Sequence, residues 1–237
     1  MSKHWPQGLH AIGGPWPLVS CHLPVWGNSA VLIDTGLWGA PRGLRKLMCR
    51  LGLKPESLCA ILLTHGHLDH TGGLAAIKAW SRAPVYAHPA EQAHIDGNYP
   101  YRGAARVCGA LEAAGRALLR YRTVKIDVTL RDGDELPFWG GLRVVHLPGH
   151  TAGHCGFFSA RENVLFSGDL FASYGVCTHL APGFLNSEPT RLPASVARVR
   201  ALDPVGLIPN HYDCADITAH RRRFERLCRE FRQTERS

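Results

Sequence analysis

The chain of 237 residues has no run of about 18 consecutive apolar residues, the length that an α-helix needs to cross a membrane. Its first residues, 1–6, do not show the charged segment, apolar run and small-residue cleavage site of a secretory signal peptide. The sequence therefore predicts a protein without membrane contact, which we expect in the cytoplasm.

Cysteine pairs and lysine are also scarce. The eight cysteines include no Cys-x-x-Cys pair, which argues against a zinc knuckle and against a disulfide framework. Most of them are expected to be small buried residues. The chain has 14 histidines and only five lysines, and this excess of histidine over lysine is the more informative feature of its composition.

The formal net charge of +8 comes mostly from arginine, which is concentrated at positions 221–223 and between residues 102 and 122. Two solvated helix faces explain these arginines better than nucleic-acid binding, because no aromatic stacking residues are interleaved with them. Arginines around the entrance of a binding pocket could still attract an anionic substrate. We expect a small-molecule substrate and do not expect nucleic acid as a partner.

Short apolar strands and amphipathic helices follow one another along the chain, which predicts an α/β fold with ample material for a core. The predicted strands are residues 9–12, 18–23, 30–33, 58–63, 85–87, 125–130, 142–147, 155–159, 164–166 and 205–208. The predicted helices are residues 39–51, 73–80, 190–202 and 216–231, and a long loop spans residues 170–189.

Residues 91–122 interrupt this pattern with a turn-rich piece and then a predicted helix that carries Val107, Leu111, Leu118 and Leu119. We interpret the segment as a helical insertion over one end of a single domain that spans residues 1–237. Insertions of this kind often form lids. A dimer contact is the alternative, and the sequence leaves the oligomeric state open.

Three histidines and an aspartate crowd the turn after the predicted strand 58–63: His65, His67, Asp69 and His70. Imidazole nitrogen and carboxylate oxygen both bind zinc at about 2.0–2.2 Å, and ligands close in sequence reduce the entropy cost of assembling a site. The alternative is a polar turn with satisfied histidines, which suits a lone histidine better than this cluster. The cluster alone does not decide between one metal ion and two.

Four further residues of the same chemistry also follow predicted strands: Asp34, His150, Asp169 and His211. Ligand sites in layered α/β proteins gather at the carboxyl ends of strands. We therefore expect these residues and the histidine cluster to share one pocket.

The order of these motifs resembles the metallo-β-lactamase fold superfamily: His-x-His-x-Asp-His at 65–70, Pro-Gly-His-Thr at 148–151, Ser-Gly-Asp at 167–169 and Asn-His at 210–211. The resemblance runs from Asp34 to His211 and so covers essentially the whole chain. It implies a four-layer αββα sandwich, with two mixed β-sheets packed face to face and helices outside.

The resemblance also implies a ligand set for two metal ions. His65, His67 and His150 would hold one ion, Asp69, His70 and His211 the other, and Asp169 would bridge them. Asp34 matches a position that supports the ligands, as a carboxylate that fixes an imidazole does. Zinc suits this set best, and iron or manganese would also fit.

Two divalent ions about 3.5–4 Å apart lower the pKa of a bridging water and supply hydroxide near neutral pH. Asp69 and the second ion would then stabilise the leaving group. No serine or cysteine motif offers a protein nucleophile.

Within the superfamily, seven ligands with a bridging aspartate are similar to those of glyoxalase II-type thioesterases, lactonases and phosphodiesterases, whereas true β-lactamases usually lack that bridge. The leading expectation is a hydrolase of a small ester, thioester or lactone. Only one predicted helix follows His211, where glyoxalase II has a helical domain that binds glutathione. The alternatives are a phosphodiesterase or nuclease and an iron-dependent redox enzyme.

Two residues of the loop 170–189 are candidate catalytic groups. Acyl-homoserine lactonases have a tyrosine shortly after the bridging aspartate. Tyr174 lies in a comparable loop and is a candidate oxyanion donor. His179 is near enough in sequence to reach the same pocket, and a plain loop position is the alternative for both. His146 and His154 are expected to support the site or the fold, and His220 to pack in the core.

Overall fold

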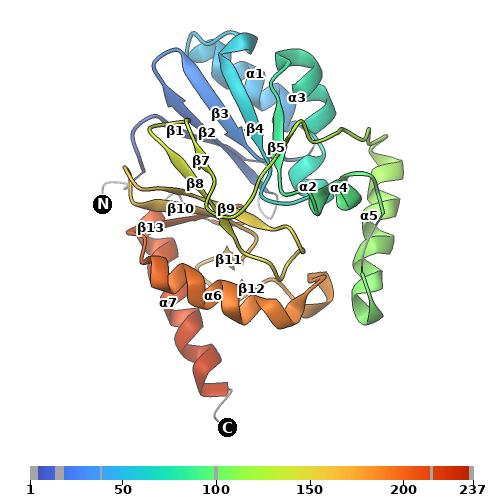
Figure 1. The fold of residues 1–237 in the computed structure, drawn as a ribbon, viewed down its shortest axis with the longest axis vertical. Helices are drawn as coiled ribbons and strands as arrows, with labels where there is room; N and C mark the ends of the chain where they lie inside the picture. The colour runs from blue at the N-terminus through green and yellow to red at the C-terminus, as the bar shows by residue number, and fades with distance from the viewer. Residues whose placement is uncertain (1–4, 14–18, 38, 99–100, 214–215, 235–237) are drawn as a thin grey trace.

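The computed structural model describes residues 5–13, 19–37, 39–98, 101–213 and 216–234. Two β-sheets lie face to face with helices on both outer sides, so that the molecule has four layers in the order α, β, β, α (Figure 1). The predicted αββα sandwich is confirmed.

The first sheet has six strands in sequence order: β1 (Leu9–Gly13), β2 (Ser20–Trp26), β3 (Ser29–Ile33), β4 (Leu58–Leu62), β5 (Val85–Ala87) and β6 (Val128–Thr129). Strands β1 to β3 are antiparallel, whereas β3 to β6 run parallel. The carboxyl ends of β3, β4 and β5 therefore meet at one edge of the sheet.

The second sheet has the order β13-β10-β9-β8-β7. Its strands are β7 (Glu135–Leu136), β8 (Leu142–His146), β9 (Cys155–Ser159), β10 (Val164–Gly168) and β13 (Gly206–Pro209). Strands β10 and β13 are parallel, and β9 is antiparallel to both β8 and β10. Strands β8, β10 and β13 thus run in one direction and also end at a common edge.

Seven α-helices complete the described part of the chain: α1 (Ala40–Arg50), α2 (Leu68–Thr71), α3 (Leu74–Ser81), α4 (Glu91–Ile95), α5 (Arg106–Leu118), α6 (Leu192–Leu202) and α7 (Ile217–Thr234). Helices α1 and α3 cover the first sheet, α6 and α7 cover the second, and α5 stands at the side of the sandwich (Figure 1). In the described chain, no helix is both long and apolar enough to pass through a lipid bilayer.

The core is divided by the sheets because successive side chains of a strand point to opposite faces. On β3, Leu32 packs toward α1 and α3, whereas Val31 and Ile33 face the second sheet. On β10, Phe166 faces the first sheet and Leu165 faces α6 and α7. Near-continuous apolar runs such as 58–63 are therefore buried on both sides, as parallel strands between helices and a second sheet require.

Several elements differ from the prediction. Strand β2 starts at Ser20 and continues through Pro24 to Trp26, paired with β1 on one side and with β3 on the other. The predicted strand 125–130 shrinks to two residues, and the two-residue strand β7 was not predicted. The predicted loop 170–189 contains a hairpin of β11 (Phe171–Ser173) and β12 (Thr178–Leu180).

Seven cysteines lie in the described residues; they form no disulfide, and four of them are buried. Cys214, Leu18, residues 99–100 of the predicted insertion and the side chain of Phe231 lie outside the part that is described. His220 is buried on α7, which confirms its packing role. Its Nδ1 forms a hydrogen bond with Oγ of Ser173 at 2.7 Å.

Candidate metal centre

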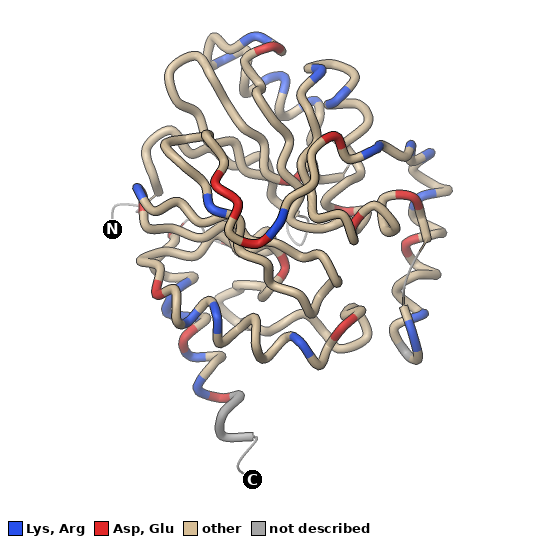
Figure 2. Tube along the Cα trace, viewed as in Figure 1, with Lys and Arg blue, Asp and Glu red and all other residues tan. Residues whose placement is uncertain are grey.

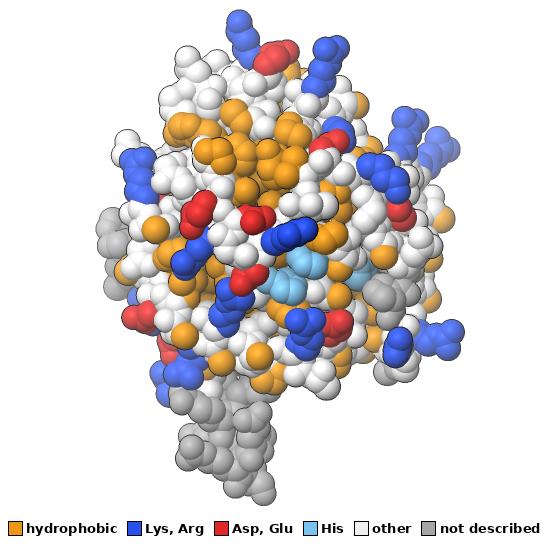
Figure 3. All heavy atoms as spheres, in the orientation of Figure 1, with side chains coloured by type: hydrophobic (Ala, Val, Ile, Leu, Met, Phe, Trp, Pro, Cys, Tyr) orange, Lys and Arg blue, Asp and Glu red, His pale blue; other side chains and the backbone are white. Residues whose placement is uncertain are grey.

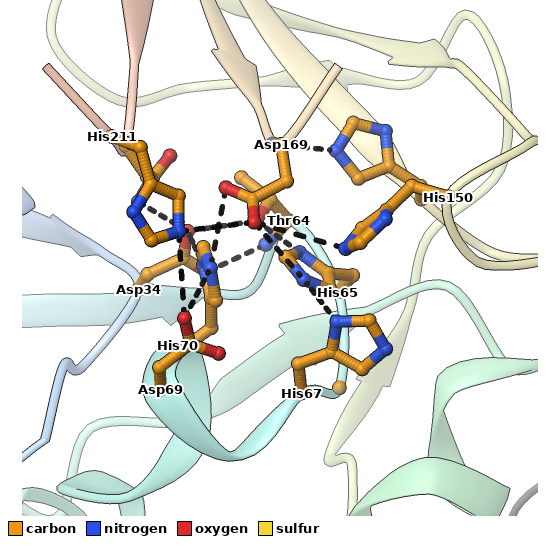
Figure 4. Close-up of polar contacts among 12 residues, drawn as sticks. Asp34, Thr64, His65, His67, Asp69, His70, His150, Asp169 and His211 are labelled. Atoms are coloured by element: carbon orange, nitrogen blue, oxygen red, sulfur yellow. Dashed lines mark hydrogen bonds and ion pairs between the residues drawn. The ribbon is translucent and has the colours of Figure 1, made fainter. Parts of the chain in front are cut away.

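The predicted ligands converge where strands of both sheets end (Figure 4). His65 and His67 lie in the loop after β4, and Asp69 and His70 lie on the short helix α2. The second sheet contributes three ligands from the segments after β8, β10 and β13: His150, Asp169 and His211. The expectation of one shared pocket is met by this geometry.

Three imidazoles form the first group. One ring nitrogen each of His65, His67 and His150 lies within 4.8 Å of the others, and all three residues are buried. Nε2 of His65 and Nδ1 of His67 are 3.1 Å apart, close to the roughly 3.4 Å that separates two ligands about 2.1 Å from a tetrahedral zinc ion. Burial and the neighbouring histidines hold the pKa of His65 and His67 well below the ordinary value. These rings are neutral at pH 7, as metal ligands must be.

The second group contains two carboxylates and two imidazoles: Asp69, His70, Asp169 and His211. Burial alone would lower the pKa of His70, but Asp169, Asp69 and Asp34 raise it well above its ordinary value. Burial alone would also lower the pKa of His211, but Asp169 and Asp69 raise it to about 12. The carboxylates of this group therefore attract positive charge, which is the charge that a bound cation would supply.

Asp169 lies between the two groups. Its Oδ2 is 3.7 Å from Nε2 of His150 on one side and 3.2 Å from Nε2 of His211 on the other. Its Oδ1 is 3.3 Å from Nε2 of His70. Burial alone would raise the pKa of Asp169, but the charges of His211 and His70 hold it well below its ordinary value. The carboxylate is thus ionised and within reach of both groups.

Each of four histidines has one ring nitrogen turned away from the centre and bonded to an outer partner. The pairs are His65 with Thr64, His67 with Tyr101, His70 with Asp34, and His150 with Asn186. Such partners fix the orientation and tautomer of a metal-binding imidazole. The support predicted for Asp34 is confirmed: its Oδ2 accepts from Nδ1 of His70 at 3.0 Å.

The remaining nitrogens suit a divalent cation. Nε2 of His150 is buried and has no hydrogen-bond partner among the described residues. Nε2 of His70 and Oδ1 of Asp169 are also buried and lie 3.3 Å apart as an ion pair. Buried polar atoms without a partner are costly unless a ligand or ion satisfies them. The set of imidazoles and carboxylates matches the donors that zinc and iron prefer. The residues therefore fit a metal centre.

Two cavities open onto the centre. One has a volume of about 270 Å³ and lies beside the β11–β12 hairpin, with Phe171, Tyr174, His179, Pro182 and Leu185 in its wall. The other has a volume of about 330 Å³ and lies against α5, with Leu37, Cys108, Leu111 and Glu112 in its wall. None of the described residues that line either cavity is lysine or arginine.

Tyr174 and His179 both line the cavity beside the hairpin. His179 pairs with Ala172 across the hairpin, and its Nδ1 lies 2.8 Å from the backbone oxygen of Leu180. Burial raises the pKa of Tyr174, so that its hydroxyl keeps its proton at neutral pH. The structure thus brings both residues to the mouth of the centre, and their catalytic roles remain predictions.

Other histidines support the site or lie outside it. Nε2 of His154 accepts the backbone N–H of Asp169 at 3.1 Å, as expected for a supporting residue. Burial lowers the pKa of His154 to about 3, so that this nitrogen stays an acceptor. His146 and His88 stack on each other with ring centroids 4.6 Å apart, outside the ligand groups.

Three residues beside the ligands were not predicted from the sequence: Tyr101, Glu112 and Asn186. Tyr101 and Glu112 come from the segment 91–122, and Asn186 lies in the loop that was predicted without structure. Each forms a hydrogen bond with a ligand, or with the loop that carries the ligands, at a sequence separation of at least 34 residues. No local motif could have identified them, because only the folded chain brings them to the histidines.

Comparison with known proteins identifies the family. The sequence model of the metallo-β-lactamase superfamily matches residues 15–198. The chain belongs to the metallo-β-lactamase superfamily.

Several members of the superfamily are similar in sequence. An uncharacterized protein of Mycobacterium bovis is 32% identical over 222 residues, which cover 89% of this chain and 94% of that protein. The probable metallo-hydrolase YflN of Bacillus subtilis is 27% identical over 80% of this chain and 77% of its own length. A hydroxyacylglutathione hydrolase of Bdellovibrio bacteriovorus is 31% identical over 64% of this chain and 47% of its own length.

Two solved structures of the superfamily are similar as well. A family protein from Thermus thermophilus has a TM-score of 0.75 and 26% identity, and the match covers 96% of this chain and 80% of that one. TTHA1623, solved in a di-iron-bound form, has a TM-score of 0.64 and 32% identity over 85% of this chain and 91% of its own. The chain is a metal-dependent hydrolase of this superfamily, which binds divalent metals.

Proposed function

We propose that this enzyme holds two divalent metal ions and cleaves a small ester, thioester or lactone. The observation that carries the proposal is the position of Asp169, whose carboxylate lies within 4.0 Å of ring nitrogens from both ligand groups. A single carboxylate between a group of three histidines and a group of one aspartate and two histidines is an arrangement for two adjacent cations.

His65, His67 and His150 would hold one ion, Asp69, His70 and His211 the other, and Asp169 would contact both. Zinc is the first candidate, and the relative in a di-iron-bound form makes iron the second, with manganese also compatible with this donor set. When bound, such a pair supplies a nucleophile from water near neutral pH and polarises the oxygen of the bond under attack.

The chain's own groups would orient the substrate and stabilise charge. Tyr174 keeps its proton because burial raises its pKa, so its hydroxyl can donate to an oxygen that becomes negative. His179 lines the same wall and can contact the acyl or alcohol part of a substrate. Asp69, whose carboxylate lies beside His70 and His211, would act near the leaving group.

The cavity beside the hairpin favours a small substrate without an anionic group. Its volume of about 270 Å³ and its apolar wall suit a short acyl chain or lactone ring. Among the described residues, no lysine or arginine lines the cavities to pair with the phosphate of a phosphodiester. Lysine and arginine are instead spread over the outer helices and loops (Figure 2). On the face shown in Figure 3, they are scattered among acidic, apolar and other side chains, and a few lie next to one another at the right-hand edge.

Metal analysis of the purified protein and a substrate panel test the proposal. The panel contains nitrophenyl esters, lactones, thioesters and bis-nitrophenyl phosphate. We expect about two metal ions per chain and turnover of at least one carbonyl substrate. Asp169→Ala should lower the occupancy of both ions and abolish turnover, and Tyr174→Phe should lower kcat about tenfold or more with the metal content unchanged.

Asp132→Ala is the matched control, because Asp132 is a partly exposed carboxylate that pairs with Arg198 on the surface. It should keep both metals and full turnover. Full turnover in Asp169→Ala would contradict the proposal, and turnover confined to bis-nitrophenyl phosphate would assign the enzyme to the phosphodiesterases instead.

A further inference from the structure

Three charged side chains on helices α4 and α5 hold the backbone of the histidine loop, residues 65–70 after β4. Oε2 of Glu91 accepts the N–H of Gly66 at 2.7 Å, and Nη2 of Arg116 donates to the oxygen of Gly66 at 3.3 Å. The carboxylate of Glu112 accepts the N–H of Leu68 at 3.0 and 3.1 Å. The histidine loop is therefore fixed from outside both sheets.

A fourth contact reaches a ligand directly. The hydroxyl of Tyr101, which is 7% exposed, hydrogen bonds with Nε2 of His67. The same hydroxyl hydrogen bonds with the side chain of Cys108. A neutral His67 that binds metal through Nδ1 carries its proton on Nε2 and donates it to the Tyr101 oxygen. Nδ1 of His67 is then without a proton and faces His65, 3.1 Å away.

Helix α5 depends on these polar contacts more than on apolar packing. Val107, Leu111 and Leu118 are 56%, 63% and 75% exposed, so its apolar residues largely face away from the core. Its inner side presents Glu112 and Arg116, whose side chains are about one-tenth exposed. Hydrogen bonds from these two residues are therefore the main connection between α5 and the histidine loop.

Glu112 is placed to hold the loop and not to bind a metal of its own. A carboxylate oxygen of Glu112 lies within 4.8 Å of ligand atoms on His67 and Asp69. Both of its oxygens accept the N–H of Leu68, however, and one of them is 3.6 Å from Nε of Arg116. His67 and Asp69 already belong to the two groups around Asp169.

We propose that Tyr101 and Glu112 are positioning residues for the metal centre. Tyr101 fixes the ring of His67 with Nδ1 toward the first group, and Glu112 fixes the backbone between His67 and Asp69. His67 of the first group and Asp69 of the second are thus held in position by contacts from Tyr101 and from Glu112 of α5. The inference rests on the proposed function, because both ligands belong to the proposed two-metal centre.

Zn²⁺ affinity, measured by competition with a chromogenic chelator, tests this inference on the full chain. Tyr101→Phe and Glu112→Ala should weaken Zn²⁺ binding about tenfold to a hundredfold, as loss of an outer partner of a metal ligand does. Glu112→Gln should stay within about threefold of the wild type, because its amide oxygen still accepts the N–H of Leu68. The d–d absorption spectrum of the Co²⁺-loaded protein should change in Tyr101→Phe, as the His67 ring reorients.

Two controls separate positioning from general damage. Val107→Ala alters an exposed residue of α5, and Tyr86→Phe removes a hydroxyl on β5; both should bind Zn²⁺ as the wild type does. Wild-type affinity in Tyr101→Phe and Glu112→Ala would overturn the inference and leave the proposed function intact. An equal loss in Glu112→Gln and Glu112→Ala would overturn the role of Glu112. A wild type that binds none of Zn²⁺, Fe²⁺ and Mn²⁺ would overturn both proposals.

Discussion

At the scale of single residues, the centre depends on which ring nitrogen each histidine presents. Asp34 shows how one side chain sets this choice, because its Oδ2 accepts from His70, Thr64 and Asn210 at 2.7 to 3.0 Å. Its Oδ1 accepts the backbone N–H of Thr64 at 2.8 Å. Since Thr64 donates its hydroxyl proton to Asp34, its oxygen accepts from Nδ1 of His65. One buried carboxylate therefore orients a ligand of each group.

Gly168, just before Asp169, provides a residue-scale prediction. Its φ is +54°, and a Cβ there would lie 2.5 Å from Nε2 of His154 and 3.0 Å from Cβ of Thr64. Gly168→Ala should lower the free energy of unfolding by about 3 kcal/mol, from left-handed strain and overpacking together. It should also weaken metal binding, because His154 holds the backbone of Asp169. Urea unfolding and chelator competition measure the two effects.

Gly27→Ala is the matched control, because Gly27 has the same φ of +54° and open space where the Cβ would stand. It should cost only about 1 kcal/mol, from strain alone, and leave metal binding unchanged. Equal losses in the two variants would show that the close approach of Gly168 to His154 has no energetic consequence.

At the scale of elements, the sequence predicted best where hydrophobic periodicity was strong and long. Strand β9 was predicted with its observed bounds, and α1 and α7 within two or three residues. Residues 171–180 were missed as a hairpin because a few residues of mixed polarity carry no clear period of two. Helix α2 was missed because His67, Leu68, Asp69 and His70 were interpreted as a turn. Their helical form depends on the loop being held in place.

An exposed ion pair that joins α3 to the β5–β6 edge gives an element-scale prediction about pH. Asp127 accepts from Nζ of Lys78 at 2.6 Å and from the N–H of Val85 at 2.7 Å. Burial alone would raise the pKa of Asp127, but the hydrogen bonds from Lys78 and Val85 lower it below the ordinary 3.8. The ionised form therefore stabilises the fold above pH 3.8, and this stabilisation is lost as the pH falls through the lowered pKa.

Asp127→Asn should accordingly reduce the free energy of unfolding at pH 7 by about 1 kcal/mol or less, because the side chain is 38% exposed and screened. The difference from the wild type should shrink at pH 3, which lies below the ordinary pKa of 3.8, because the unfolded chain then takes up the proton that the folded chain resists. Urea unfolding at both pH values measures it. A difference that stays constant between pH 7 and pH 3 would contradict the assignment.

At the scale of the whole molecule, the centre joins the two sheets. Asp34 and the histidine loop come from the first sheet, whereas His150, Asp169 and His211 come from the second. Direct hydrogen bonds reinforce the junction: Nδ2 of Asn210 donates to Asp34 at 2.8 Å and to the backbone oxygen of Ser20 at 2.9 Å. Bound metal would therefore stabilise the contact between the two halves of the sandwich.

Removal of metal provides the prediction at this scale. Treatment with a chelator should lower Tm by roughly 5–10 °C. Ions at about 100 times their dissociation constant contribute roughly 2.7 kcal/mol, and about 2–4 °C accompanies each kcal/mol in a chain of this size. Calorimetry with and without EDTA measures the shift. Asp169→Ala should show a much smaller shift, and an unchanged Tm in the EDTA-treated wild type would contradict a metal centre that joins the sheets.

The sequence alone determined the residue types of the centre and their place at strand ends, because metal donors and buried strands leave local patterns within a few residues. The tertiary structure decided which nitrogen of each histidine faces the centre and which side chains hold it there. Tyr101, Glu112 and Asn186 illustrate the difference. Many residue types can accept or donate a hydrogen bond, so an outer partner is selected by its position in the folded chain and leaves no motif in the sequence.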